Sequence, residues 1–265
     1  MSGFLETIKL SLFKVLRTPY KNKLFKDTNT NLELRFLSRL LAQEQLFFID
    51  IGANKGEFTF VAEKVLPPAK IWAFEPLPYF AKKTKALFPK ITVFEMAVSE
   101  EEIRTTIYVP VNNGIPDDSL ASVYKPDGNF NSYNINCTTL DSIIEKNYTI
   151  DEKIFLKIDV EGHEFSVLKG AEKTISNLVS VMLIEIEERH HEDKSLKEMI
   201  ESIEFFGFSC YYMSCKYSKL VKYTDNPTIL QKEEDLNTSK YVNNFWFFSK
   251  KIDYPTLVSK LNNSI

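Results

Sequence analysis

The chain has 265 residues, of which 44% are hydrophobic and 26% are charged, a balance that is ordinary for a globular protein with one large domain. Its formal net charge of -3 offers no basic excess to meet a phosphate backbone, so we expect no nucleic-acid partner. The three cysteines, Cys137, Cys210 and Cys215, lack CxxC spacing. Their number and spacing argue against a disulfide framework and structural zinc, and favour a cytoplasmic location.

The first 45 residues predict a helical extension of the main domain. Between Gly3 and Asp27, apolar side chains at helical spacing alternate with lysines and an arginine, which is typical of a basic amphipathic helix. We favour packing of its apolar stripe on the main domain, with attachment to a membrane surface as the alternative. A second helix is expected from Asn31 to Gln43. No apolar run reaches the roughly 18 residues of a membrane-spanning helix, and no signal-peptide pattern is present, so we expect no transmembrane segment.

From residue 46 to 265, short apolar runs alternate with helical patterns. This alternation predicts one Rossmann-like α/β domain, with a mostly parallel sheet and helices on both faces. The runs are too apolar for two-sided alternation, as expected of strands buried on both faces. Strands are expected at 46–51, 70–75, 92–98, 154–160 and 181–187, followed by 208–213 and by 244–249, which we place antiparallel at that edge of the sheet.

The segments between these strands divide into helices and loops. Helices are expected at 58–65, 79–87 and 194–206. Residues 112–136 are rich in Asn, Asp, Ser, Gly and Pro, which predicts a long loop of the kind that often acts as a lid. The aromatic residues Tyr124, Phe130 and Tyr133 could stack on a sugar or another flat-faced substrate, or close the lid over an apolar core. Ser119 and Ser122 could contact the cofactor or the acceptor. A surface excursion is expected at 223–237.

Ligands of an open α/β sheet bind beyond the carboxyl ends of its strands, and the first expected strand ends in a glycine-rich turn. Its candidate cofactor-binding residues are Asp50, Gly52, Ala53, Asn54 and Gly56. Glycines permit a tight turn and close approach of the backbone to a ligand. The GxxxG spacing differs from the GxGxxG that cradles a dinucleotide pyrophosphate, so a cofactor without pyrophosphate is the natural interpretation. A purely structural strand-to-helix turn is the alternative.

The second expected strand ends in Glu75 and Pro76, about 20 residues beyond the glycines. A carboxylate at this position can accept hydrogen bonds from both hydroxyls of a ribose. NAD and S-adenosylmethionine both present such a diol, so Glu75 indicates a nucleoside cofactor without choosing between them. A solvated carboxylate at the end of a strand is the structural alternative.

The exit of the fourth expected strand is densely charged, in the segment DVEGHE at 159–164. At this point the sequence resembles the FkbM-type methyltransferase family, whose members mostly methylate oxygen on sugars and other small hydroxylated metabolites. The matching segments stand in the order and spacing of the family, from about residue 47 to 187. They are FIDIGANKGEFT, AFEP, TTLDSII, FLKIDVEGHEFSVLKGAE and LIEIE.

The resemblance implies a class I methyltransferase-like fold, S-adenosylmethionine as cofactor, and a small-molecule or glycan hydroxyl as acceptor. It implies that the turn at 50–56 surrounds the methionine part of the cofactor and that Glu75 holds the ribose. The end of the third strand, around Ala97, would border the adenine. Asp159 would lie between the cofactor and the acceptor.

Ionisable residues after the fourth and fifth expected strands are candidates for catalysis. Methyl transfer to oxygen requires in-line alignment, and a base that takes the hydroxyl proton should help. We expect His163 or Asp159 to act as general base, and Glu161 and Glu185 to orient the acceptor or each other. No metal is expected because no tight ligand spacing such as HExxH appears, although Asp159, Glu161 and His190 offer a cation site as the alternative.

Several of these residues also have a structural interpretation. Glu161 and Glu164 could cap the helix that follows, where carboxylates meet the positive end of the helix dipole. His190 and His191 could be exposed loop residues. For the whole chain, two alternatives remain. The first is a NAD-dependent oxidoreductase, against which the missing middle glycine of GxGxxG counts. The second is a non-catalytic cofactor-binding scaffold, which would not need so many charged residues at the ends of its strands.

Overall fold

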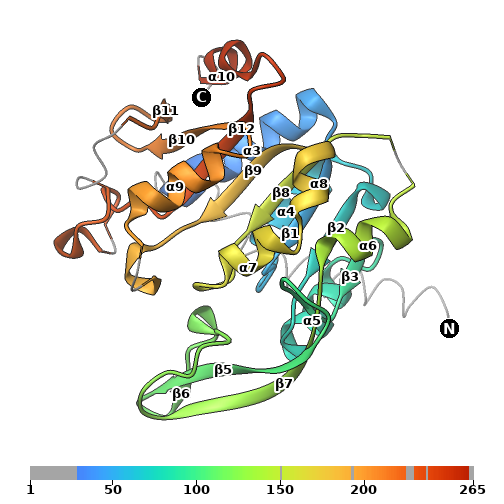
Figure 1. Ribbon diagram of the computed structural model, residues 1–265, viewed down its shortest axis with the longest axis vertical. Coiled ribbons are helices and arrows are strands. Elements are labelled where there is room, and N and C mark those ends of the chain that lie inside the picture. The colour runs from blue at the N-terminus through green and yellow to red at the C-terminus, as the bar shows by residue number, and fades with distance from the viewer. Residues whose placement is uncertain (1–28, 150, 192–193, 225–229, 237, 263–265) are drawn as a thin grey trace, which may run out of the picture.

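The computed structural model describes residues 29–149, 151–191, 194–224, 230–236 and 238–262. Its central sheet has the strand order β11-β10-β12-β9-β8-β1-β2-β3 (Figure 1). The parallel strands are β1 (Phe47–Ile51), β2 (Ile71–Phe74), β3 (Thr92–Phe94), β8 (Ile154–Ile158) and β9 (Val179–Glu185). The antiparallel strands are β10 (Phe208–Ser214), β11 (Lys219–Lys222) and β12 (Asn244–Ser249). The expected Rossmann-like α/β fold is confirmed.

Helices cover both faces of this sheet, because successive apolar residues of each strand point to opposite sides. In β1, Ile49 belongs to the core on one face and Phe48 to the core on the other. The first face is covered by α6 (Leu140–Asn147), α7 (Glu164–Lys169), α8 (Glu172–Asn177) and α9 (Leu196–Glu204). The second face is covered by α3 (Asn29–Glu44), α4 (Glu57–Val65) and α10 (Tyr254–Asn262). The sheet is therefore the middle layer of three.

The helices expected at 31–43, 58–65, 79–87 and 194–206 correspond to α3, α4, α5 (Pro78–Leu87) and α9. Helix α3 packs against α4 and β10, so it adds to the core of the main sheet. The basic helix expected at 3–27 lies outside the described residues, and the domain boundary at residue 45 stays a prediction. Among the described residues, no helix is both long and apolar enough to cross a membrane.

A second sheet forms an arm below the first (Figure 1), and sequence reasoning missed it. Its order is β4-β7-β5-β6. Its strands are β4 (Ala97–Val98), β5 (Arg104–Asn112), β6 (Ile115–Pro116) and β7 (Phe130–Thr138). The expectation of a loop at 112–136 was wrong at its C-terminal end. Residues 130–136 belong to β7, which pairs with β5. Only Ile135 and the two residues Cys137 and Thr138 of β7 are buried, so its exposed Asn and Ser residues gave it the composition of a loop.

Two further expectations were wrong in detail. The single strand expected at 92–98 is two strands, since β3 belongs to the central sheet while Ala97 in β4 pairs with Cys137 in the arm. Strand β12 does not lie at the edge; it lies between β9 and β10. Phe245, Trp246 and Phe247 are fully buried there, since their side chains alternate between the cores on the two faces of the sheet. The short β11, with its exposed lysines, forms that edge instead.

Candidate active site at the carboxyl ends of the strands

A cavity of about 290 Å³ lies beyond the carboxyl ends of β1, β2, β8 and β9, and the arm closes its far side. The predicted site residues that line it are Gly52, Asn54, Glu75, Pro76, Ala97, Asp159, Glu161, His163 and Glu185. The volume is close to the lower end of the range for small-molecule sites. Glu75 and Glu185 lie 23 and 133 positions from Gly52 in the chain, and they line the same cavity as Gly52 because the parallel strands end at one edge of the sheet.

The remaining residues of the predicted cofactor loop, Asp50, Ala53 and Gly56, do not line this cavity. Asp50 is buried within β1, where one carboxylate oxygen accepts a hydrogen bond from the Thr59 hydroxyl at 2.6 Å. Burial raises the pKa of Asp50. Asp50 therefore has a structural role: through Thr59 it links β1 to α4, away from the cavity.

Gly52 allows the turn after β1 to lie directly against the end of β8. Its φ is +78°, and the backbone nitrogens of Gly52 and Ala53 both donate to the Phe74 carbonyl at 3.0 Å. A Cβ atom on Gly52 would lie 1.7 Å from the Asp159 carbonyl oxygen. The glycine is therefore required both for its left-handed backbone and for the approach that brings Asp159 to the cavity.

We expect Gly52→Ala to lower the free energy of unfolding by about 3 kcal/mol, through backbone strain and overpacking together. Gly128→Ala is the matched control: Gly128 also has a positive φ, of +83°, but nothing lies within 4 Å of its added Cβ. It should therefore lose only about 1 kcal/mol. Urea unfolding measures both, and equal losses in the two variants would contradict the close-approach explanation.

Glu75 is held in the cavity wall by two backbone hydrogen bonds. Its Oε2 accepts from the Asn54 nitrogen at 2.8 Å and its Oε1 from the Leu77 nitrogen at 2.9 Å. Only 3% of the residue is exposed, and burial raises its pKa to about 7. Each carboxylate oxygen has a second lone pair, so Glu75 can still accept hydrogen bonds from a bound diol.

The cavity wall beside Glu75 is apolar. The side chains that form this part are Phe74, Leu77, Met96, Ala97, Val98, Ile107 and Ile135. They come from the end of β2, from the residue before α5, from the residue before β4, and from β4, β5 and β7 of the arm, so the arm completes this apolar slot. A flat heterocycle such as adenine could fill it, next to the carboxylate that a ribose would need.

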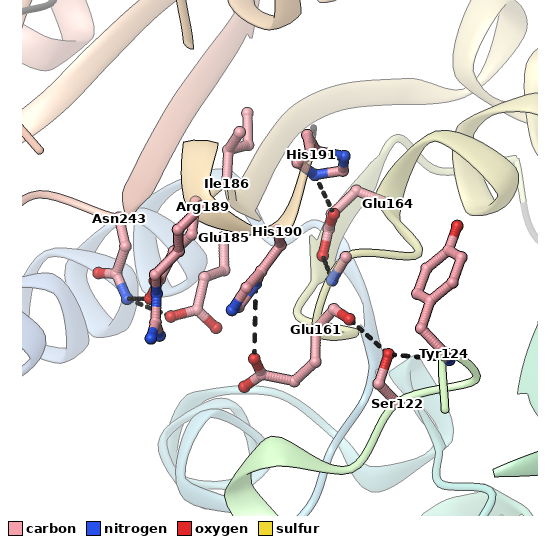
Figure 2. A network of polar contacts seen from close by, with 12 residues as sticks. Ser122, Tyr124, Glu161, Glu164, Glu185, Ile186, Arg189, His190, His191 and Asn243 are labelled. Carbon is pink, nitrogen blue, oxygen red and sulfur yellow. Dashed lines mark hydrogen bonds and ion pairs between the residues drawn. The ribbon is translucent and has the colours of Figure 1, made fainter. Parts of the chain in front are cut away.

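Three carboxylates, on Asp159, Glu161 and Glu185, converge at the other end of the cavity, where each offers an oxygen within 4.8 Å of the others. The Lys157 ammonium donates to Asp159 Oδ2 at 2.7 Å. The Asn243 amide nitrogen donates to Glu185 (Figure 2). Sequence reasoning did not assign a role to Lys157 or Asn243, although a lysine inside the apolar run of β8 was a visible signal.

The protonation of this cluster follows from burial and from Lys157. Burial opposes ionisation of Asp159, but the adjacent Lys157 ammonium outweighs it and lowers the pKa of Asp159. Burial and the charge on Asp159 raise the pKa of Glu185 well above its usual value, and burial raises that of Glu161 to about 8. The opposite shifts of the two pKa values favour an ionised Asp159 beside a protonated Glu185. The three oxygens could also hold a divalent cation.

The three histidines take different positions. His163 Nε2 lies 3.0 Å from the Ser99 hydroxyl, and burial lowers its pKa, so the imidazole is neutral near pH 7. His190 Nδ1 lies 3.8 Å from Glu161 Oε2. His191 Nε2 lies 3.1 Å from Glu164 Oε2 (Figure 2). Only His163 lines the first cavity; the other two are neither fully exposed nor part of that wall.

A second cavity, of about 720 Å³, adjoins the first and shares Ser122 and Glu161 with it. The Ser122 hydroxyl donates to the Glu161 carbonyl oxygen at 2.8 Å, so the arm is tied to the loop after β8 (Figure 2). Tyr124 lines this second cavity, whereas Phe130 and Tyr133 line neither cavity. The Ser119 side chain lies outside the described part of the chain.

Comparison with known proteins gives a family for this arrangement. The model of the FkbM methyltransferase domain matches residues 50–210. No curated protein matched the chain. An FkbM methyltransferase structure from Methylobacillus flagellatus KT is similar at 18% identity and a TM-score of 0.44, covering 76% of this chain and 43% of that one. An O-methyltransferase from Bacillus cereus, in complex with SAH, is similar at 12% identity and a TM-score of 0.44, covering 89% of each chain. The present chain therefore spans less than half the length of the M. flagellatus chain.

Proposed function

Because the chain belongs to the FkbM methyltransferase family, we propose that it transfers a methyl group from S-adenosylmethionine to a hydroxyl oxygen of a sugar, a glycan or another small metabolite. The observation that carries this proposal is that Gly52, Glu75 and Asp159 line a single cavity. The family match favours a methyltransferase over a NAD-dependent oxidoreductase. The carboxylates at the junction of two cavities favour an enzyme over a scaffold, because a scaffold has no use for buried charges there.

The residues of the first cavity fit this cofactor. Glu75 would accept hydrogen bonds from the ribose hydroxyls, and the apolar slot around Ala97 would take the adenine. The Asn54 amide oxygen is enclosed and has no hydrogen-bond partner among the described residues, so it is available to the methionine ammonium. The ionised Asp159 would face the positive sulfonium. When bound, S-adenosylmethionine supplies an electrophilic methyl group.

The residues at the junction would hold and activate the acceptor. Asp159 would accept a hydrogen bond from the acceptor hydroxyl and so orient its oxygen for in-line attack. Asp159 or, as the second candidate base, neutral His163 would take the hydroxyl proton when the cofactor's methyl group is transferred to that oxygen. Protonated Glu185 and Glu161 can donate hydrogen bonds to the same acceptor and so fix its orientation.

Calorimetry with S-adenosylhomocysteine and with NAD tests the cofactor class. We expect S-adenosylhomocysteine to bind and NAD not to bind, since the loop at 50–56 lacks the third glycine of a pyrophosphate site. Binding of NAD alone would support an oxidoreductase, and binding of neither would support a scaffold. Methyl transfer from labelled S-adenosylmethionine to a panel of hydroxylated acceptors then tests the reaction.

A further inference from the structure

The second cavity lies where the acceptor of the proposed reaction would extend away from the methyl donor. It shares Glu161 and Ser122 with the first cavity, so a molecule whose hydroxyl reaches the carboxylate cluster would continue into it. Gly162, which has a φ of +93°, lines the second cavity next to Glu161, and its position lies against His190 and the Tyr124 ring.

The walls of this second cavity differ in charge from those of the first. The first cavity is lined by the acidic residues Glu75, Asp118, Asp159, Glu161 and Glu185. Among the described residues that line the second cavity, Glu161 is the single carboxylate, while Arg189 and Lys194 are cationic. Burial also raises the pKa of Glu161 to about 8, which leaves it mostly protonated at neutral pH. Among the described residues that line the second cavity, cations therefore outnumber carboxylates.

The two cations are placed to bind a ligand. The Lys194 ammonium lies 4.3 Å from the centre of the Phe165 ring, and no described carboxylate lies within ion-pair distance of it. Arg189 pairs with Glu187 through Nε, and 47% of its side chain is exposed. A guanidinium has five N–H donors, so most of them are left for an anion. Phe165 and Tyr124 add ring faces of the kind that pack on sugars and other flat groups.

We propose that the acceptor carries an anionic group, a carboxylate or a phosphate, which Lys194 and Arg189 bind in the second cavity while the hydroxyl to be methylated lies at the carboxylate cluster. This inference rests on the proposed function and narrows its substrate class to acidic hydroxylated compounds. Such a group would also fix which hydroxyl reaches Asp159, because the anion and the reacting oxygen are held at opposite ends of the acceptor.

The three histidines allow a direct test, because the chain has only three: His163 lines the first cavity, and His190 and His191 line the second. Imidazole ¹H–¹⁵N NMR signals of the untagged protein, loaded with S-adenosylhomocysteine, would be followed during titration with three probes. These are methyl glucuronide, glucose 6-phosphate and the neutral methyl glucoside. We expect at least one anionic probe to shift the His190 and His191 signals with an affinity about tenfold or more above that of the glucoside.

Variants assign the effect to the cation. Lys194→Met should weaken binding of the anionic probe about tenfold and leave the glucoside unchanged. Lys197→Met is the control, since Lys197 pairs with Glu201 on α9 and lies outside both cavities. The stronger anionic probe identifies carboxylate or phosphate as the group recognised. Equal binding of charged and neutral probes, absence of any anion-dependent shift, or equal effects of the two lysine variants would overturn the inference. A failure of the proposed function would instead show as a His163 signal that S-adenosylhomocysteine does not move.

Discussion

Asp159→Asn should lower the turnover of methyl transfer by about 10² to 10⁴-fold, the range that a general base contributes. The physical reason is the pairing with Lys157, which keeps Asp159 ionised inside a buried site. An amide in its place cannot take the proton of the acceptor hydroxyl. Turnover would be measured with saturating labelled S-adenosylmethionine and the best acceptor of the panel.

Two further variants make this result specific. Asp127→Asn changes an exposed carboxylate of the arm, outside both cavities, and should leave turnover unchanged. His163→Ala separates the candidate bases: if it lowers turnover by the larger factor while Asp159→Asn retains most activity, the base is His163. Affinity for S-adenosylhomocysteine would be measured for each variant, so that a loss of cofactor binding is not taken for a loss of the base.

The central sheet could be predicted from the sequence because its strands are buried on both faces. A short, continuous apolar run such as that of β2 (Ile71–Phe74), with helical patterns before and after it, is typical of a strand in a parallel sheet. Since parallel strands end at one edge, the positions of Gly52, Glu75 and Asp159 at their ends also indicated one common site. The family resemblance at DVEGHE then indicated which cofactor such a site would take.

The arm could not be predicted in the same way. Strand β7 has one face toward solvent, and its Asn and Ser residues resemble a loop in composition. Its pairing with β5 depends on contacts between residues 20 to 32 positions apart, which a local pattern does not encode. The same limit applies to the site: Ser122 reaches Glu161 from the arm, and Asn243 reaches Glu185 from the turn before β12. Local reasoning therefore found the strand ends, named Ser122 as a contact to cofactor or acceptor but not to Glu161, and missed Asn243.

Lys157 is a core residue whose charge acts on the candidate catalytic residue Asp159. It is 2% exposed, contacts the Phe58 ring at 4.5 Å, and lies among the carboxyl groups of Glu33, Asp50 and Asp159. A buried charge of this kind is stable only with opposite charges around it. The lysine thus favours an ionised Asp159 at the cavity, although it belongs to a strand whose other residues serve the core alone.

Binding of S-adenosylhomocysteine should strengthen as the pH rises through 7, and Glu75 is the reason. The free protein has a Glu75 pKa of about 7, raised by burial, whereas a ribose diol donates hydrogen bonds to the ionised carboxylate. Below pH 7 the protonated fraction must first lose its proton, so the apparent dissociation constant rises as the ionised fraction falls. Between pH 8 and pH 5.5 we expect affinity to fall about 30-fold, measured by calorimetry in buffers of constant ionic strength.

Substitution of Glu75 identifies the titrating group. Glu75→Gln should weaken binding at pH 8 and flatten the pH profile, since an amide neither ionises nor accepts at both atoms from the Asn54 and Leu77 nitrogens. Glu161 also has a raised pKa, of about 8, but lies at the carboxylate cluster. Glu161→Gln should therefore keep the dependence around pH 7. A profile that Glu161→Gln flattens and Glu75→Gln preserves would move the titrating group, and with it the ribose site, away from the end of β2.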